Sequence, residues 1–243
     1  MLKEIIKASE NIVFFGGAGV STESNIPDFR SESGLYTART VYGHPSEYLL
    51  SYTCFNNKPE LFFRYYKENL IHINAKANAA HAALAGLEKA GRLSAVITQN
   101  IDGLHQAAGS ENVIELHGSN SRQYCMGCAA VYGLDYIMNP SNCDGFIPKC
   151  ARCGAVVRPD VVLYEEQLDN DVVESAVRAI SAADCLIVGG TSLVVYPAAG
   201  LLRYFGGNRL VLINKGETDY DEHADLVIRE SIGKVLSEAV AGL

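Results

Sequence analysis

The chain has 243 residues, of which 48% are hydrophobic and 20% are charged. This length and composition allow a large apolar core and exclude a disordered tail or a fibrous repeat. The net charge of −8 disfavours general binding to nucleic acid, because such binding depends on Lys and Arg neutralising phosphates.

Short apolar runs alternate with helical patterns, and each run has the length of a strand buried on both faces. In chain order the runs are Ile12–Phe15, Ser94–Thr98, Asn112–Leu116, Asp160–Tyr164, Cys185–Val188 and Leu210–Ile213. Helical patterns cover Pro59–Ile73 and Ala75–Ala90, and Asp169 or Asp171 is expected to cap a further helix. The alternation predicts an α/β fold with a Rossmann-like, doubly wound parallel sheet.

This alternation is interrupted twice. Residues 31–80 hold helices without a clear strand, and residues 121–157 hold cysteine pairs and little apolar periodicity. We interpret these segments as the helical and zinc-binding parts of a smaller lobe, inserted into one domain, 1–243. The large Rossmann-like lobe is then expected at approximately residues 1–30, 81–120 and 158–243.

Four of the seven cysteines form two pairs with the spacing of metal ligands. Cys125 and Cys128 form one pair, Cys150 and Cys153 form the other, and 21 residues separate the pairs. Four thiolates from two such knuckles suit one tetrahedral zinc ion, with no coordination position left for catalysis. We therefore predict one structural zinc per chain, and a redox role for the two motifs is the alternative.

The first residues, MLKEIIKASE, make a poor signal peptide, so we expect a cytoplasmic protein. The stretch Cys185–Leu202 has 18 uncharged residues, the lower limit for a membrane-spanning helix. It contains Gly189-Gly190-Thr191-Ser192 and then Tyr196-Pro197, which predict a buried strand, a loop and a helix instead. No association with a membrane is expected.

Polar and glycine residues follow the predicted strands where these strands end. In a parallel sheet the carboxyl ends of the strands meet at one edge, where ligands bind. Taken singly, each cluster also has a structural explanation as a tight turn, an Asx turn or a histidine satisfied within the fold. The clusters are Gly16–Gly19, Gln99–Asp102, His117-Gly118, Gly190–Ser192 and Asn214.

Taken in order, these motifs resemble the signature of the sirtuin family, in its bacterial-type catalytic core. The resemblance spans residue 16 to about residue 232 and depends on the ordered set rather than on any single motif. The motifs are Gly17-Ala-Gly-Val-Ser21, Ile26-Pro-Asp-Phe-Arg30, Thr98-Gln-Asn-Ile-Asp102 with Leu104-His105, His117-Gly118, the two cysteine pairs, Gly190-Thr-Ser-Leu193 with Tyr196-Pro-Ala-Ala199, and Ile213-Asn214.

The resemblance implies an NAD-dependent protein-lysine deacetylase that consumes NAD and yields nicotinamide, O-acetyl-ADP-ribose and free lysine. In sirtuins the acyl oxygen attacks C1′ of the nicotinamide ribose as nicotinamide leaves. The histidine that matches His117 then acts as general base through the ribose hydroxyls. The implied partners are acetyl-lysine proteins or peptides, with NAD as co-substrate.

The same resemblance implies roles for individual residues. Those with a catalytic role would be His117, Asn100 and Asp102. Those that contact NAD would be Ala18, Thr22, Phe29, Arg30, Gln99, Asn100, Ile101, Asp102, His117, Thr191, Ser192, Asn214 and Ile232. The substrate peptide would lie as an added strand between Leu163-Tyr164-Glu165 and Val194-Val195.

Two residues depart from the family's pattern. Gly16 stands where a Thr or a similar residue usually precedes Gly-Ala-Gly, and no loss of function is expected. Glu165 replaces the glycine of an aromatic-Gly-Glu motif. This replacement places a charge near the peptide groove and leaves the sequence preference for substrates open.

Sirtuins that remove acidic acyl groups resemble one another in a Tyr-x-x-Arg pair on the helix after Pro59. In this chain the two positions fall on Phe63 and Tyr66, which we expect to face the acyl pocket, with Arg64 toward solvent. Neither side chain offers a cation to a succinyl or malonyl carboxylate. We therefore expect a preference for acetyl and other uncharged acyl groups.

Other functions compete with deacetylation. A dehydrogenase would use the same glycine loop but needs a hydride-acceptor site, for which the sequence shows no candidate. A zinc-ribbon module for nucleic acid would present basic residues near the cysteines, where there are only Arg122, Lys149, Arg152 and Arg158. A sirtuin-type ADP-ribosyltransferase, or a deacylase of other acyl groups, shares the NAD site and is the nearest alternative.

Overall fold

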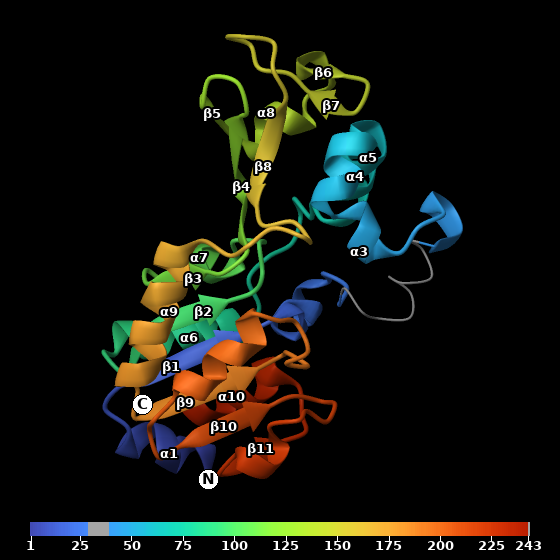
Figure 1. The fold of residues 1–243 in the computed structure, drawn as a ribbon. Helices are drawn as coiled ribbons and strands as arrows, with labels where there is room; N and C mark the ends of the chain where they lie inside the picture. The colour runs from blue at the N-terminus through green and yellow to red at the C-terminus, as the bar shows by residue number, and fades with distance from the viewer. Residues whose placement is uncertain (29–38, 243) are drawn as a thin grey trace.

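The computed structural model describes residues 1–28 and 39–242. At its centre is a parallel sheet in the order β11-β10-β9-β1-β2-β3 (Figure 1). The order reverses between β1 and β9, as in a doubly wound Rossmann-like sheet, so the predicted fold class is confirmed. The strands are β1 (Ile12–Gly16), β2 (Leu93–Thr98), β3 (Val113–Glu115), β9 (Cys185–Gly189), β10 (Leu210–Ile213) and β11 (Leu226–Ile228).

Helices cover both faces of this sheet, and the central strand β1 is therefore buried at every position. Ile12 and Phe14 pack into the core that α1, α6 and α10 cover. Val13 and Phe15 point the other way, into the core that α9 and η4 cover. The covering helices are α1 (Leu2–Ala8), α6 (Ala79–Lys89), α9 (Asn170–Ala182), the 3₁₀ helix η4 (Ala198–Tyr204) and α10 (Ile232–Val240).

Side-chain caps set the starts of two predicted helices. The Asp169 carboxylate accepts from the N–H groups of Asp171 and Val172, which confirms it as the cap of α9. The helix predicted from Ala75 begins only at Ala79, because the side chain of Asn78 accepts hydrogen bonds at its first turn. The helix predicted to end at Ile73 is α5, which already ends at Asn69.

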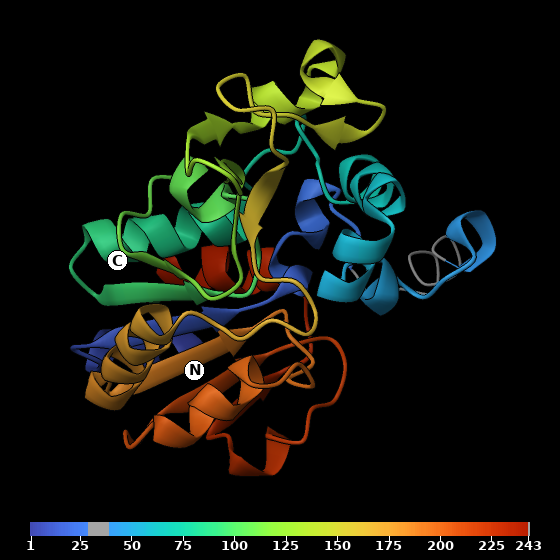
Figure 2. The same cartoon turned by 45° about the horizontal axis from the view of Figure 1, so that its top comes forward.

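A second unit lies beyond one end of the parallel sheet (Figure 1, Figure 2). It joins an antiparallel sheet, in the order β5-β4-β8, to a β6-β7 hairpin and to the helices α3, α4 and α5. Buried side chains from the helices and from the cysteine-bearing segment share one core, which includes Phe62, Cys125, Ile137 and Val157. The two insertions inferred from the sequence therefore pack against each other.

The elements of this unit are α3 (Ser46–Leu49), α4 (Tyr52–Asn57), α5 (Pro59–Asn69), β4 (Gly118–Cys125), β5 (Val131–Gly133), α8 (Leu134–Met138), β6 (Cys143–Asp144), β7 (Ile147–Pro148) and β8 (Val157–Val161). Short connecting helices are η1 (Ala18–Val20), η2 (Thr22–Ser24), α7 (Leu104–Ala107), η3 (Pro140–Asn142) and η5 (Asp221–His223).

The prediction that Asp160–Tyr164 forms a strand of the parallel sheet is wrong. The strand in this region, β8, covers Val157–Val161 and pairs antiparallel with β4. An apolar run shows that a segment is buried but not which sheet it joins, and here the neighbouring β4 provides the pairing edge. Tyr164 instead forms an isolated bridge with Ser51.

Within the two described segments of the chain, no helix combines the length and the apolar character needed to cross a bilayer. The uncharged stretch Cys185–Leu202 forms β9, a loop and part of η4, as the sequence analysis predicts.

Candidate active site

A cavity of about 990 Å³ opens where the carboxyl ends of the parallel strands face the second unit. Residues after β1, β2, β9 and β10 line it on one side, as the strand-end rule predicts. Leu50, Tyr66 and Leu163 of the second unit also line it. Its volume lies at the upper end of the range of about 300–1,000 Å³ for small-molecule sites.

The glycine loop after β1 lies directly against the loop after β9. The N–H of Gly19 donates to the carbonyl oxygen of Gly190 at 2.8 Å. A Cβ atom on Gly19 would come within 2.7 Å of the Gly190 Cα atom, so a side chain there would push the loops apart. Gln99 reinforces the junction, since its Nε2 donates to Thr191 Oγ1 at 3.1 Å.

A polar network joins the glycine loop to the segment after β2. The Nδ2 group of Asn100 lies 3.0 Å from the carbonyl oxygen of Gly17 and 3.1 Å from Ser21 Oγ, and donates to both. The Ser21 hydroxyl in turn donates to Asp102 Oδ2 at 2.7 Å, and Asp102 Oδ1 accepts from the N–H of Leu104 at 2.9 Å. These bonds fix the amide and the carboxylate at the cavity wall.

His117 lines the cavity just after β3, and its orientation follows from one hydrogen bond. Its Nδ1 lies 2.9 Å from the carbonyl oxygen of Gln99. A carbonyl oxygen can only accept, so Nδ1 carries the proton and Nε2 of the neutral ring is the acceptor. Burial lowers the pKa of His117 below its ordinary value, although the bond to Gln99 opposes this shift. The ring is therefore suited to take a proton near neutral pH.

Gly118 explains why the chain can turn sharply after this histidine. Its φ of +76° lies in the left-handed region that favours glycine. A Cβ atom at this position would also collide with the carbonyl oxygen of Asp160 on the paired strand β8.

The structure brings together most of the residues that the resemblance implies for NAD and substrate. The lining includes Ala18, Thr22, Gln99, Asn100, Ile101, Asp102, His117, Leu163, Tyr164, Glu165, Thr191, Ser192, Val195, Asn214 and Ile232. Val194 is not among the lining residues and is 54% exposed. Phe29 and Arg30 lie outside the described residues.

The expectation for α5 is confirmed at one position and wrong at the other. Tyr66 lines the cavity, and its hydroxyl donates to Asn120 Oδ1 at 2.5 Å. Phe63 is fully buried against Phe55 and Phe62 and is absent from the cavity lining. The helix directs the Phe63 ring into the core of the second unit, where neighbouring aromatic rings enclose it. Arg64 faces solvent as expected and is 48% exposed.

Two residues of the site were not identified from the sequence. Ser21 is the last residue of the motif Gly17-Ala-Gly-Val-Ser21. The presence of a hydroxyl group just after the glycines could have marked it as a site residue. Asn120 binds Tyr66, and its Nδ2 donates to the carbonyl oxygen of Leu70 at 2.9 Å. No sequence signal marks Asn120, because its partners come from a distant helix.

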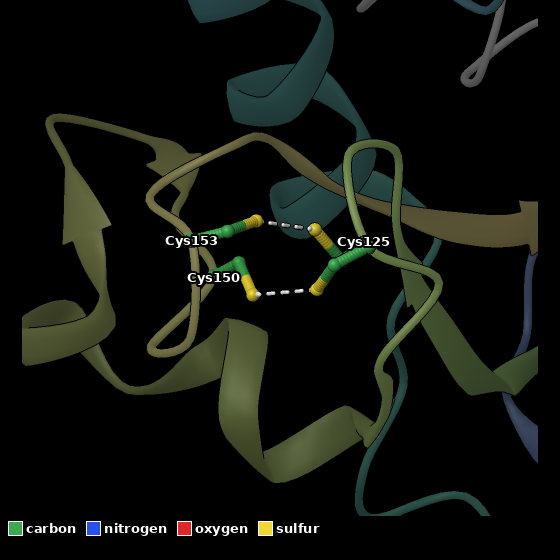
Figure 3. A group of neighbouring side chains, drawn as sticks. Cys125, Cys150 and Cys153 are labelled. Atoms are coloured by element: carbon green, nitrogen blue, oxygen red, sulfur yellow. Dashed lines mark hydrogen bonds between the residues drawn. The ribbon is translucent and has the colours of Figure 1, made fainter.

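The four predicted metal ligands converge at one point of the second unit. Figure 3 shows the labelled side chains of Cys125, Cys150 and Cys153 directed toward one another. The four sulfur atoms, including that of Cys128, lie within 4.8 Å of one another. Two of the separations are 3.4 Å and 3.6 Å, close to the value of about 3.8 Å expected around tetrahedral zinc. The cluster fits a structural zinc ion with four protein ligands.

Comparisons with known proteins agree with this geometry. A family model described as Sir2 family matches residues 17–197. A protein of Clostridium acetobutylicum named NAD-dependent protein deacetylase is 59% identical over 239 residues, covering 98% of this chain and 96% of that protein. A protein of the same name from Clostridium tetani is 58% identical over 242 residues, covering 100% of this chain and 97% of that protein.

Solved structures show the same similarity. A Sir2 structure with a deacetylated p53 peptide and 3′-O-acetyl-ADP-ribose gives a TM-score of 0.87 at 38% identity, covering 98% of this chain and 95% of that chain. A complex of a Sir2 homologue with NAD gives a TM-score of 0.86 at 39% identity, covering 99% and 91%. With a matching family model over most of its length and full-length relatives at this identity, the chain belongs to the Sir2 family, the sirtuins.

Proposed function

We propose that this protein is an NAD-dependent protein-lysine deacetylase. The observation that carries the proposal is the 2.9 Å contact between His117 Nδ1 and the carbonyl oxygen of Gln99, which leaves Nε2 of the neutral ring as the proton acceptor. This base lines the same cavity as the glycine loop and the Gln99–Asp102 segment. Family membership and relatives named NAD-dependent protein deacetylase support the same activity.

The residues of the chain would share the work as follows. NAD, as a co-substrate, supplies an electrophilic ribose carbon and the acceptor for the acyl group. Asn100 and Asp102, fixed through Ser21, would hold the nicotinamide end, and His117 would remove a proton from a ribose hydroxyl. The loop with Thr191 would hold the adenosine end, together with Asn214 and Ile232.

We also propose how the chain divides around this cavity. The large lobe would comprise approximately residues 1–30, 81–120 and 158–243, and the small lobe residues 31–80 and 121–157, except that the ends of β4 and β8 and the residue Leu163 pack with the small lobe. Acetylated proteins or peptides would enter beside Leu163–Glu165, where they could add a strand. A cytoplasmic location is proposed as well, since none of the seven cysteines forms a disulfide and four of them cluster as metal ligands, a state that a reducing compartment preserves.

One incubation distinguishes the candidate activities. The purified protein is mixed with NAD and an acetyl-lysine peptide, and nicotinamide, NADH and peptide mass are followed together. Deacetylation is expected to release nicotinamide and to remove the acetyl mass from the peptide, with no NADH formed. Formation of NADH, or a peptide that keeps its acetyl group and gains ADP-ribose, would contradict the proposal.

A further inference from the structure

Glu165 has an unusual backbone conformation for its residue type. It is exposed at the rim of the cavity, and its φ of 78° lies in the left-handed region. That region favours glycine, because a Cβ atom there approaches the backbone carbonyl. Outliers of this kind are concentrated at binding segments, which makes the Glu165 side chain a candidate for a functional role.

The side chain of Glu165 is held in place by one residue of α4. Its Oε2 accepts from the N–H of Thr53 at 2.9 Å and from the Thr53 hydroxyl at 2.7 Å. Among the described residues, Oε1 has no hydrogen bond, and no ion pair involves this carboxylate. A negative charge is therefore fixed at the rim without a cation from the described part of the chain beside it.

The segment that carries Glu165 is also held firmly. Arg158 binds both carboxylate oxygens of Glu166, at 2.8 Å and 2.9 Å. Glu166 Oε2 also accepts from the N–H of Leu163 at 2.9 Å. The backbone of Tyr164 pairs with the junction between α3 and α4, since its N–H donates to the carbonyl oxygen of Leu50 and its carbonyl oxygen accepts from the N–H of Tyr52. A carboxylate on so constrained a segment is pre-organised for binding.

From these contacts we propose that Glu165 selects acyl-lysine peptides that carry Lys or Arg beside the acyl-lysine, over peptides with an acidic residue there. This inference rests on the proposed function and names the substrate class of the same cleft. Side chains of an added strand alternate between its two faces, so a flanking side chain of the peptide would lie along the Glu165 rim. The net charge of −8 also attracts basic peptides.

The test uses acetyl-lysine peptides that differ at one position only. Arg, Gln or Glu is placed in turn at each position within about three residues of the acetyl-lysine. With the wild-type protein, kcat/KM for the Arg peptide is expected to exceed that for the Glu peptide by about two- to fivefold at one position, the range of an exposed ion pair. The ratio is expected to shrink as salt is added.

Variants test whether the carboxylate of Glu165 causes the preference for the Arg peptide. Glu165→Gln removes the charge but keeps an oxygen for Thr53, and it is expected to bring the Arg-to-Glu ratio close to one. Glu165→Arg is expected to invert the ratio. The matched control is Glu174→Gln on the exposed face of α9, which is expected to keep the wild-type ratio.

Three results would overturn the inference. One is a wild-type protein without charge preference at every position. Another is a Glu165→Gln variant that keeps the wild-type ratio of kcat/KM between the Arg and Glu peptides. This outcome includes an equal loss of rate on both peptides, which would mean that Glu165 only supports the loop. If no acetyl peptide is deacetylated under any condition, the proposed function itself fails and the inference fails with it.

Discussion

A single contact with the backbone sets the protonation site of the His117 ring. Because the carbonyl oxygen of Gln99 occupies Nδ1, only Nε2 of the neutral ring can accept a proton. Replacing the ring removes the base and leaves the polar groups that would hold NAD in place.

We therefore predict that His117→Ala abolishes deacetylation while NAD binding is largely retained. Loss of a general base typically slows a reaction by about 10²- to 10⁴-fold. Turnover of an acetyl peptide and calorimetric titration with NAD measure the two properties separately. His223→Ala, at an exposed histidine, is the control. Turnover near the wild-type rate in His117→Ala would remove this residue from the mechanism.

The pH dependence of activity is also expected to report on His117. Burial is the main cause that lowers the pKa of His117 below 6.5. The base works in its neutral form, so activity is present above this lowered pKa and is lost as the pH falls through it. We predict that the acid limb of kcat/KM has its midpoint below 6.5. A midpoint above this value would show that the ring is charged more easily than its burial implies.

Asp102 accepts two hydrogen bonds that an amide cannot both accept through one oxygen. Asp102→Asn would turn an NH₂ group toward either Ser21 or the N–H of Leu104. We predict weaker handling of nicotinamide, by about fivefold if about 1 kcal/mol of hydrogen bonding is lost. Nicotinamide inhibition and nicotinamide exchange are the measurements. Asp171→Asn on α9 is the control, and equal inhibition constants for wild type and Asp102→Asn would contradict the assignment.

The helix α5 supplies one wall of the cavity, and that wall contains no cation. Tyr66 lines the cavity, whereas neither Arg64 nor Lys67 does. The Arg64 guanidinium instead pairs with Glu68 on the exposed face of the helix. A succinyl carboxylate in this cavity would therefore find no positive side chain on α5.

We predict that acetyl-lysine is preferred over succinyl-lysine by more than about tenfold in kcat/KM, because burying an unpaired carboxylate is costly. Matched acetyl and succinyl peptides decide the question. Arg64→Ala is expected to leave the ratio unchanged, since this side chain is outside the cavity. A higher kcat/KM on the succinyl peptide would refute the prediction.

The four cysteines join two segments of the second unit, one at the end of β4 and the other between β7 and β8. A bound zinc ion would thus contribute directly to the folding free energy of this unit. We predict one zinc ion per chain by elemental analysis. Removal of zinc with a chelator is expected to expose the segment 121–157 to proteolysis and to abolish activity.

Single substitutions test which cysteines bind the metal. Cys150→Ser is expected to lose zinc, whereas Cys143→Ser, a cysteine outside the cluster, is expected to keep it. Active wild-type protein without zinc would contradict the prediction.

Strands with purely apolar sequences were predictable, because a residue run such as Ile12–Phe15 must be buried on both faces. The sheet to which a run belongs was not predictable, as β8 shows, because pairing depends on an edge provided by distant residues. The strand β11 was not predicted, since it has only three residues.

The part of the candidate site that follows the ends of the strands was predictable from sequence motifs. His117 and the Gln99–Asp102 segment line the cavity as predicted. Phe63 was misplaced because helical spacing defines a face of α5 but not which neighbour that face meets. Asn120 was not predicted for a related reason, since its role depends on a hydrogen bond from Tyr66, which lies 54 residues earlier in the sequence.

At the scale of the whole molecule, the cavity depends on the reversal of strand order between β1 and β9. The connections that follow β1 and β9 run on opposite faces of the parallel sheet, which leaves a crevice at the carboxyl ends of these strands. The second unit lies beyond this end of the sheet (Figure 1), and its residues Leu50 and Leu163 line the cavity. One surface can therefore hold a dinucleotide and a peptide at the same time.

During synthesis, Gly19 leaves the ribosome long before Gly190, yet its N–H donates to the carbonyl oxygen of that later residue. The loop after β1 therefore completes its contacts only once β9 has been translated and inserted beside β1. Asn214, another residue of the cavity, follows β10 and is made later still. A nascent chain thus gains a complete dinucleotide site only late in translation, and a fragment that ends before β9 would carry His117 but is expected not to bind NAD in a titration.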